Sequence, residues 1–207
     1  MKIIKPKAEI LTAINGEEII RHIERCGRVC YKSEDKTTES SRAKFVASII
    51  KRGHEAVLEH HSLTVKFTVD RGVSHEIVRH RLASYCQEST RFCNYANAKF
   101  GNEITVIKPV FFNEAAPEYN IWKAACECAE IAYFSLLKEG RTPQEARSVL
   151  PNSLKTEIMM TANLREWRHF FKLRAAPAAH PQMREVVIPL IKQMKECVPV
   201  VFDDLEV

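Results

Sequence analysis

Glycine is scarce in this chain of 207 residues, occurring only six times, at positions 16, 27, 53, 72, 101 and 140. No two of these glycines are close enough to form the GxGxxG dinucleotide fingerprint or a phosphate-binding P-loop. A nucleotide bound by this chain must therefore be held by side chains. Arginine is the side chain whose planar fork of donors best matches a phosphate, so the arginines are the residues to follow.

Paired cysteines are also lacking. The seven cysteines are odd in number and irregularly spaced, and no CxxC pair occurs, which argues against a structural zinc site or a redox dithiol. The histidine-rich run from His54 to His61 does not offer the i, i+4 pair of a helical zinc site, so we predict no metal. Cys86 lies among arginines and a histidine that would lower a thiol pKa, but a nucleophile also needs a positioned base.

Long apolar runs are absent as well. No segment approaches the ~20 apolar residues that span a bilayer, and the first residues, MKIIKPKAEIL, lack the apolar run of a signal peptide. We therefore expect a cytoplasmic protein with no membrane partner. The net charge is +5 and is not gathered in a basic tail. A nucleic-acid-binding module using basic helix faces is an alternative, which the scattered arginines disfavour, so we expect no nucleic-acid partner.

What the chain does contain is a mixture of helical and strand patterns, which predicts an α+β protein with a single domain over residues 1–207. The clearest strand is 62–70, where apolar side chains alternate with threonine and lysine. Further strands are predicted at 2–12, 103–107 and 156–161. Helices are predicted at 16–30, 40–51, 73–83, 117–138, 143–150, 163–174 and 183–197. The longest should bury Ile121, Ala125, Cys128, Ala132 and Leu136, and Pro189 should kink or shorten the last.

Two predicted helices carry arginines on apolar faces. In helix 73–83 Arg81 falls among Val73, Ile77, Val78 and Leu82, whereas Arg79 and His80 fall on the other side. Either Arg81 is paired or it extends along the surface to solvent. Three consecutive side chains cannot face one way, so they must address different ligands or subunits.

The helix 163–174 repeats this arrangement. Its apolar face contains Leu164, Trp167, Phe170 and Phe171, and Arg174 projects from the same sector. The opposite side is predicted to carry Arg165, Arg168, His169 and Lys172. Arg147 lies at the edge of the short helix 143–150, where an exposed side chain is the simpler interpretation.

These segments resemble one known family. RHRLASYCQES, followed by Arg91, fits the Arg-His-Arg, seven residues, Ser pattern of flavin-dependent thymidylate synthases. RGHEAVLEH, EARSVLP, NLREWRHF and LRAAPAAHPQ resemble other blocks of that family in the same order, so the likeness covers roughly residues 15–190. It implies an α+β fold with a central, mainly antiparallel sheet flanked by helices.

The resemblance also implies an activity. Members are methyltransferases that convert dUMP to dTMP reductively in dTMP biosynthesis. 5,10-Methylenetetrahydrofolate supplies the carbon, NADPH the reducing equivalents, and bound FAD mediates. The active sites lie at subunit interfaces of a homotetramer, so the implied partners are dUMP, the folate and further copies of the chain. The family needs no enzymic nucleophile, which removes that role from Cys86.

The family's roles transfer position by position. Arg174 resembles the catalytic arginine that favours ionisation of uracil at N3, and a fixed cation in a dry site suits that role. The residues that resemble FAD contacts are His54, Arg79, His80, Arg81, Gln87, Asn163, Arg165 and His169. The residues that resemble dUMP contacts are Glu76, Arg79, Gln87, Glu88, Ser89, Thr90, Arg91, Arg147 and Arg174.

The chain departs from the commoner family residues at a few of these places. Many members have Gln at the position of Glu76, Asn at Cys86, Glu at Gln87, Asn at His169, and Ser or Thr at Ala56. An enzyme of the same fold acting on another pyrimidine nucleotide, such as dCMP, is therefore the second hypothesis for its substrate. NADH in place of NADPH also stays open.

Overall fold

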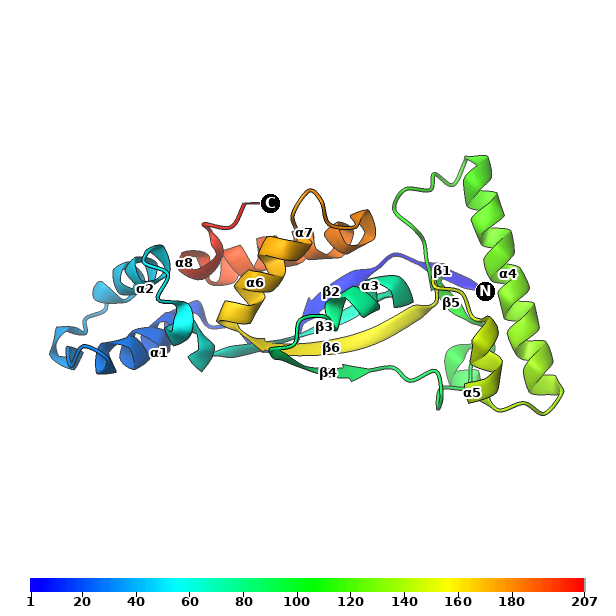
Figure 1. Ribbon diagram of the computed structural model, residues 1–207, viewed down its shortest axis with the longest axis horizontal. Helices are drawn as coiled ribbons and strands as arrows, with labels where there is room; N and C mark the ends of the chain where they lie inside the picture. Colours follow the sequence, from blue (N-terminus) through cyan, green and yellow to red (C-terminus); the bar gives the residue numbers. More distant parts are fainter. Residues whose placement is uncertain (207) are drawn as a thin grey trace. The chain divides into compact units, whose positions relative to one another are not determined.

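The alternating segment predicted at 62–70 forms β3 (Ser62–Asp70), the best buried strand of the computed structural model, which describes residues 1–206. Leu63, Val65, Phe67 and Val69 are completely buried, as the alternation predicts. β3 belongs to a four-stranded sheet in the order β2-β3-β6-β4, with β2 at Lys7–Ile10, β6 at Lys155–Asn163 and β4 at Ala83–Gln87 (Figure 1).

Contacts along β3 show that its neighbours run antiparallel to it. Thr64 lies opposite Thr161, with their hydroxyl oxygens 2.9 Å apart, and the Leu164 amide donates to the His61 carbonyl at 3.0 Å. On the other side, Lys66 pairs with Glu9 at 3.4 Å and the Leu11 amide donates to the Thr64 carbonyl at 2.9 Å. The helix-flanked antiparallel sheet implied by the resemblance is confirmed.

The chain forms two compact units. Unit 1 comprises Met1–Lys7, Phe67–Arg79 and Tyr85–Met159; unit 2 comprises Ala8–Lys66, His80–Ser84 and the chain from Met160 onward. Each of the four strands of the sheet contributes residues to both. The single domain over residues 1–207 stays a prediction, and residue 207 lies outside the described part.

Unit 1 contains a parallel pair, β1 (Lys2–Ile4) with β5 (Thr105–Ile107), beside the long helix α4 (Pro117–Lys138) (Figure 1). It also contains α3 (Arg71–Ile77), α5 (Pro143–Ala146) and two 3-10 turns, Ala98–Phe100 and Arg147–Val149. Thr142 and Glu145 form the capping box that their spacing indicates. The core of this unit consists of Tyr95, Ile104, Val106, Cys126, Tyr133, Ala146 and Leu154.

The buried face of α4 differs from the predicted one. Cys126 and Tyr133 are buried, whereas Ile121 is 72% exposed and Ala125 and Cys128 are exposed too. Tyr133 is part of an aromatic group with Tyr95 and Phe134, and this group determines which side faces inward. A helix with small apolar residues on several sides has no dominant stripe, so periodicity alone selected the wrong face.

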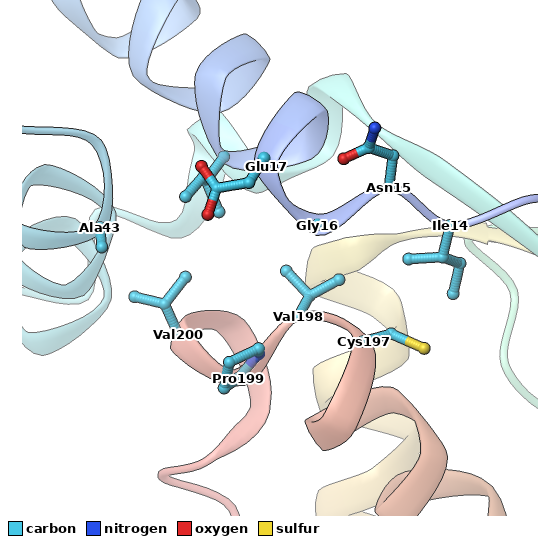
Figure 2. A pocket seen from close by; sticks show the side chains of 10 residues that line it. Ile14, Asn15, Gly16, Glu17, Ala43, Cys197, Val198, Pro199 and Val200 are labelled. Carbon is cyan, nitrogen blue, oxygen red and sulfur yellow. The ribbon is translucent and has the colours of Figure 1, made fainter. Parts of the chain in front are cut away.

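Unit 2 contains α1 (Gly16–Val29), α2 (Ser41–Lys51), α6 (Leu164–Arg174), α7 (Pro181–Cys197) and α8 (Pro199–Phe202), with 3-10 turns at Glu34–Lys36 and Glu55–His60. The aromatic face predicted for α6 is confirmed. Trp167, Phe170 and Phe171 are buried against one another and against Phe202, and the Trp167 indole donates to the Leu63 carbonyl at 3.1 Å. A cavity of about 480 Å³ lies where the start of α1 meets Cys197 and Val198 (Figure 2).

The helix predicted at 73–83 is wrong in its second half. α3 ends at Ile77, the chain turns, and β4 begins at Ala83, a strand that the sequence did not indicate. Val78 and Leu82 are 37% and 74% exposed, so Arg81 does not sit on a buried apolar face. The predicted strand 2–12 is two strands separated at Pro6, and helix 143–150 is α5 followed by a 3-10 turn. Pro189 does not shorten the last helix, which begins earlier, at Pro181, and runs to Cys197.

Among the residues described, 1–206, no helix is both long enough and apolar enough to cross a membrane.

Candidate functional site

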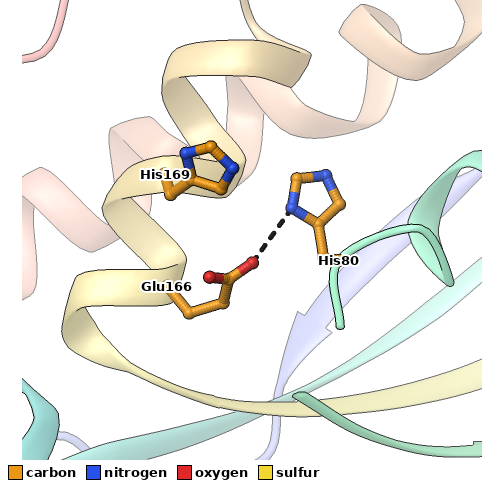
Figure 3. A group of neighbouring side chains, drawn as sticks. All are labelled: His80, Glu166 and His169. Carbon is orange, nitrogen blue, oxygen red and sulfur yellow. Dashed lines mark hydrogen bonds and ion pairs between the residues drawn. The ribbon is translucent and has the colours of Figure 1, made fainter. Parts of the chain in front are cut away.

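His80 links the two ends of α6. Its Nδ1 lies 3.1 Å from Oε1 of Glu166 in the first turn, and its Nε2 accepts a hydrogen bond from Nε of Arg174 in the last turn at 3.0 Å. His80 and Glu166 are 4% and 6% exposed, and Arg174 is half-buried. Figure 3 shows Glu166 and His169 on α6 facing the His80 ring. The ring also packs edge-on against Phe170, with centroids 4.9 Å apart.

Burial lowers the pKa of His80 below its ordinary value, because the charged ring would lose solvation. The hydrogen bond that Glu166 accepts from His80 acts in the opposite direction and raises the pKa, but the cationic Arg174 and the neighbouring His169 also lower it. His80 is therefore neutral at pH 7. A neutral ring is also what an arginine donor needs, because only an unprotonated nitrogen can accept.

A cavity of about 490 Å³ gathers several residues predicted to contact flavin. Asn163, Arg165 and His169 line it together with Glu166, Lys172, Leu82, Glu55 and Glu59. Asn163 caps α6, since its side-chain oxygen accepts from the Glu166 amide at 2.8 Å, which leaves its amide N–H groups as donors. Arg165 pairs with Glu59 at 2.6 Å, with both side chains about half exposed.

The residue types in this cavity suit groups of a flavin nucleotide. Arg165 and Lys172 can take a diphosphate, Asn163 and His169 can hydrogen-bond to a ring edge, and Leu82, 74% exposed, offers apolar surface. An exposed ion pair such as Arg165–Glu59 is worth little, so a phosphate can replace the carboxylate at small cost.

The remaining predicted flavin contacts in unit 2 lie elsewhere. His54 is exposed and lines a separate cavity of about 330 Å³, with its Nδ1 3.5 Å from the Tyr31 hydroxyl. Arg81 is exposed and follows directly after the buried His80. Arg79 and Arg81 are exposed on either side of the buried His80, so the three side chains do not all face one way. The cause is a turn and not a helix.

Unit 1 brings together some of the residues predicted to contact dUMP, around a cavity of about 430 Å³. Arg147 and Thr90 line it, and Nη1 of Arg147 donates to the Thr90 hydroxyl at 3.3 Å. Arg71 and His75 of α3 line the same cavity. Arg71 was not singled out from the sequence. Its place directly after a strictly alternating strand is the signal that could have found it, because strand ends commonly carry binding residues.

Gln87 and Glu88 hold the loop that follows β4. The Gln87 amide donates to the hydroxyls of Ser74 at 3.0 Å and Thr156 at 3.3 Å. Glu88 accepts from Lys155 at 2.7 Å and from the Tyr95 hydroxyl at 3.1 Å. Burial raises the pKa of Tyr95, and the Glu88 charge adds to that rise.

After Gln87 and Glu88 the chain turns through Ser89. The Ser89 hydroxyl accepts from the Arg91 amide at 3.3 Å, and its carbonyl accepts from the amides of Phe92 and Cys93. Arg91 is exposed, with its guanidinium 5.3 Å from the Phe92 ring centroid. Glu76 is half-buried on α3, and its carbonyl accepts from the Arg79 amide at 3.3 Å.

Arg168 is the one α6 residue whose predicted placement is wrong. It was placed on the solvent side, but its side chain is 1% exposed. It donates to both carboxylate oxygens of Asp204, to Glu55 and to the Val201 carbonyl. This arginine is part of the framework of unit 2 and does not line the cavity of Asn163, Arg165 and His169.

His80, Glu166 and His169 also form the one cluster of metal-binding donor types found among the described residues, with ligand atoms within 4.8 Å of one another. Two histidines and a carboxylate could in principle hold zinc or iron. However, the Nε2 lone pair of His80 already accepts from Arg174, whose positive charge opposes a bound cation.

The chain matches the family model described as "Thymidylate synthase complementing protein" over residues 12–200. It is 32% identical over 184 residues to a flavin-dependent thymidylate synthase of Geobacter sulfurreducens, covering 86% of this chain and 78% of that protein. It is 33% identical over 203 residues to the enzyme of the same name from Corynebacterium aurimucosum, covering 89% and 79% respectively.

A solved structure has the same fold. The crystal structure described as the UMP/dUMP methylase PolB from Streptomyces cacaoi, bound with 5-Br dUMP, aligns with a TM-score of 0.79. The alignment covers 98% of this chain and 96% of that one at 22% identity. Because the family model spans most of the chain and the relatives exceed 30% identity, this chain belongs to the thymidylate synthase complementing protein family, the flavin-dependent thymidylate synthases.

Proposed function

We propose that this protein methylates dUMP reductively to dTMP. The observation that carries the proposal is the hydrogen bond from Arg174 to a buried, neutral His80, in a chain that matches the family over residues 12–200. The resemblance implies that the Arg174 guanidinium contacts the uracil ring, and the hydrogen bond to His80 holds this guanidinium in one orientation. A fixed cation there stabilises negative charge developing at N3 more than water would.

The proposed co-substrates are 5,10-methylenetetrahydrofolate as carbon donor and NADPH as reductant. FAD, when bound, supplies the two-electron redox chemistry that connects them. Within unit 2 the residues proposed to hold it are Asn163, Arg165, His169 and the exposed Arg81. His80 contributes by holding Arg174.

Unit 1 is proposed to bind the phosphate of the nucleotide. Arg147 and Thr90 share a cavity wide enough for a phosphate and sugar, and Arg71 adds a second guanidinium to its wall. Arg91 and Ser89 are proposed to contact the phosphate from the loop after β4. Since Gln87 and Glu88 already have protein partners, their proposed contribution is to fix that loop.

We further propose the family's homotetramer, with active sites formed between subunits. Leu82 and Phe92, close in sequence to the Arg-His-Arg segment and Arg91, are 74% and 79% exposed. On α4, Ile121 and Ile131 are 72% and 65% exposed. Large apolar side chains that are exposed in the single chain are candidates for surfaces that a ligand or another subunit covers. Light scattering on the purified protein should give about four times the chain mass of 23.7 kDa.

The seven cysteines are unpaired, which is typical of proteins in a reducing compartment and supports the expected cytoplasmic location.

A second candidate is methylation of a different pyrimidine nucleotide by the same chemistry. It is favoured by Glu76 and Gln87, which differ from the commoner family residues. It is also in line with the similar fold of a protein described as a UMP/dUMP methylase. Product analysis with dUMP, UMP and dCMP in parallel, each at saturating concentration, separates the two candidates. Methylation of dUMP alone supports the first, and preference for UMP or dCMP supports the second.

The deciding experiment uses purified protein. We expect a yellow protein with flavin absorbance that forms dTMP from dUMP only when NADPH and methylenetetrahydrofolate are both present. Expression of the gene should also rescue a bacterium that requires thymidine. A protein that takes up no added FAD, or that binds FAD and methylates none of the three nucleotides, contradicts the proposal.

A further inference from the structure

Glu166 and Arg174 lie on opposite sides of the His80 ring, although both residues belong to α6. They are eight residues apart, which corresponds to about 12 Å along the helix axis. Helical side chains lean toward the helix N-terminus, so Arg174 reaches back along α6. The imidazole of His80 occupies the space between the two charged groups, with contacts of 3.1 Å to Glu166 and 3.0 Å to Arg174.

The two contacts determine which nitrogen of His80 carries the proton. A guanidinium can only donate, so Nε2 must be the acceptor in the bond from Arg174. The proton of the neutral ring must then be on Nδ1, where it points at the Glu166 carboxylate. A carboxylate can only accept, so this contact requires the same tautomer. With an apolar residue in place of Glu166, the Nδ1–H group would be buried without a partner.

Glu166 is itself held in place. It is buried, its amide is capped by Asn163, and it lies in the first turn of α6, where the helix dipole favours a negative charge. Arg174 lies in the last turn, where the dipole favours a positive charge. The packing of Phe170 against the ring removes a further degree of freedom from His80.

We propose that Glu166 is a positioning residue: by accepting from Nδ1–H of His80, it keeps Nε2 available to hold the guanidinium of Arg174 in its working orientation. The inference rests on the proposed function, in which Arg174 contacts the pyrimidine. Glu166 itself touches neither the substrate nor the flavin in this scheme. It acts through His80, as an orienting carboxylate does for a catalytic histidine in other enzymes.

The first test needs no activity. In flavin-free protein labelled with ¹⁵N-histidine, we expect the His80 signals of a neutral ring protonated at Nδ1. Glu166→Gln should keep that pattern, because its side-chain oxygen still accepts. Glu166→Leu should shift His80 toward the Nε2–H tautomer or a mixture. A wild-type His80 found as the Nε2–H tautomer or as imidazolium at pH 7 overturns the inference.

The second test measures turnover of dUMP in the flavin-loaded enzyme. We expect Glu166→Leu to lower kcat about 10- to 100-fold, because misplacing a catalytic group by about 1 Å has effects of this size. KM should change less, and Glu166→Gln should recover most of kcat. The matched control is Glu196→Leu, an exposed carboxylate of α7, which should behave as wild type. Normal kcat in Glu166→Leu overturns the inference.

Other outcomes are also decisive. If Glu166→Leu does not fold, the wild-type tautomer and the Glu166→Gln kinetics still decide the matter. Stoichiometric zinc binding to wild-type protein that is lost in Glu166→Gln would show a metal site and overturn the inference. Failure of the proposed function is separate, because wild-type protein would then make no dTMP whatever the tautomer of His80.

Discussion

Arg168 and Asp204 form a two-pronged ion pair, with Nη1 and Nη2 of the arginine 2.6 and 2.7 Å from the two carboxylate oxygens. The arginine side chain is 1% exposed, whereas that of Asp204 is 49% exposed. Arg168 also donates to the carbonyl of Val201 and to Glu55. It therefore fastens α6 to the segment around α8, and the hydrogen bond from Arg168 lowers the pKa of Asp204.

Replacement of Arg168 by Ala should destabilise unit 2 by about 3 kcal/mol, because a buried cation is removed and the groups it satisfied lose their partner. We place the effect at the low end of the range for buried pairs because Asp204 is half exposed. The measurement is urea unfolding of flavin-free protein followed by tryptophan fluorescence, to which the buried Trp167 contributes together with Trp122. The control is Arg165→Ala, an exposed arginine of the same helix, with an expected change below about 1 kcal/mol. Equal effects would show that burial is not the cause.

Acid should destabilise the protein through His80. Burial lowers the pKa of His80 in the folded state, so below a pH of about 6.5 the unfolded chain binds a proton that the folded chain does not. The free energy of unfolding then rises with pH in this window, and the stability is lost as pH falls from about 6.5 toward the folded pKa. Burial also lowers the pKa of His61, so His61 changes the free energy of unfolding with pH in the same direction.

His80→Asn should reduce the slope of unfolding free energy against pH by up to about 1.4 kcal/mol per pH unit, which is the contribution of one proton. The measurement is a series of urea titrations between pH 5 and 8. The control variant is His60→Asn, at an exposed histidine of the 3-10 turn Glu55–His60. If His80→Asn has the wild-type slope, folding does not lower the pKa of His80.

Gly16 touches the backbone where α7 ends. A Cβ atom at this position would lie 2.3 Å from the carbonyl oxygen of Cys197. Because this oxygen belongs to the backbone, the clash can be relieved only if the backbone moves. Gly16→Ala should therefore destabilise the protein by about 1–3 kcal/mol, as overpacking does. Thermal unfolding would measure this. Glu17→Ala, at the exposed next residue, should change stability by less than about 0.5 kcal/mol, and a similar loss in both variants would contradict the steric explanation.

The parts of the fold that could be predicted are those with one dominant local signal. Strand β3 alternates without exception, and the ends of α1 and α6 carry the caps Asn15 and Asn163, so their positions follow from the sequence. The turn after Ile77 has no glycine or proline, and its apolar residues at helical spacing continue into the exposed Val78 and Leu82. Periodicity cannot distinguish an apolar side chain that is buried from one left exposed, so β4 was missed.

The sequence named candidate residues for the site but could not predict how they are arranged. The family motifs supplied Arg174, His80 and His169. In the structure Arg174 and His169 both lie next to the His80 ring. The sequence could not show Glu166 as their partner, because that contact joins positions 86 residues apart. Nor could it separate Arg168, which is structural, from Arg165, which lines a cavity. On a helical wheel both face away from the aromatic side, and only the segment around Asp204 buries one of them.

Arg147 is the residue on which we expect phosphate recognition to depend most. It lines the cavity of about 430 Å³ in unit 1, and its partner there, the neutral Thr90 hydroxyl, is a weaker acceptor than a phosphate oxygen. Arg147→Ala should raise KM for dUMP about 10- to 100-fold, since a hydrogen bond to a charged group contributes roughly 1.5–3 kcal/mol. The value of kcat should change little, because the phosphate is held equally in ground state and transition state.

Three comparisons make this prediction specific to the phosphate. Arg147→Lys should lie between wild type and Arg147→Ala, because lysine keeps the charge but loses the planar fork. Arg141→Ala, at an exposed arginine six residues earlier, should have the wild-type KM. Deoxyuridine, which has no phosphate, should inhibit wild type and Arg147→Ala with the same weak affinity. If Arg147→Ala weakens deoxyuridine and dUMP equally, Arg147 acts on the shape of the cavity and not on the phosphate.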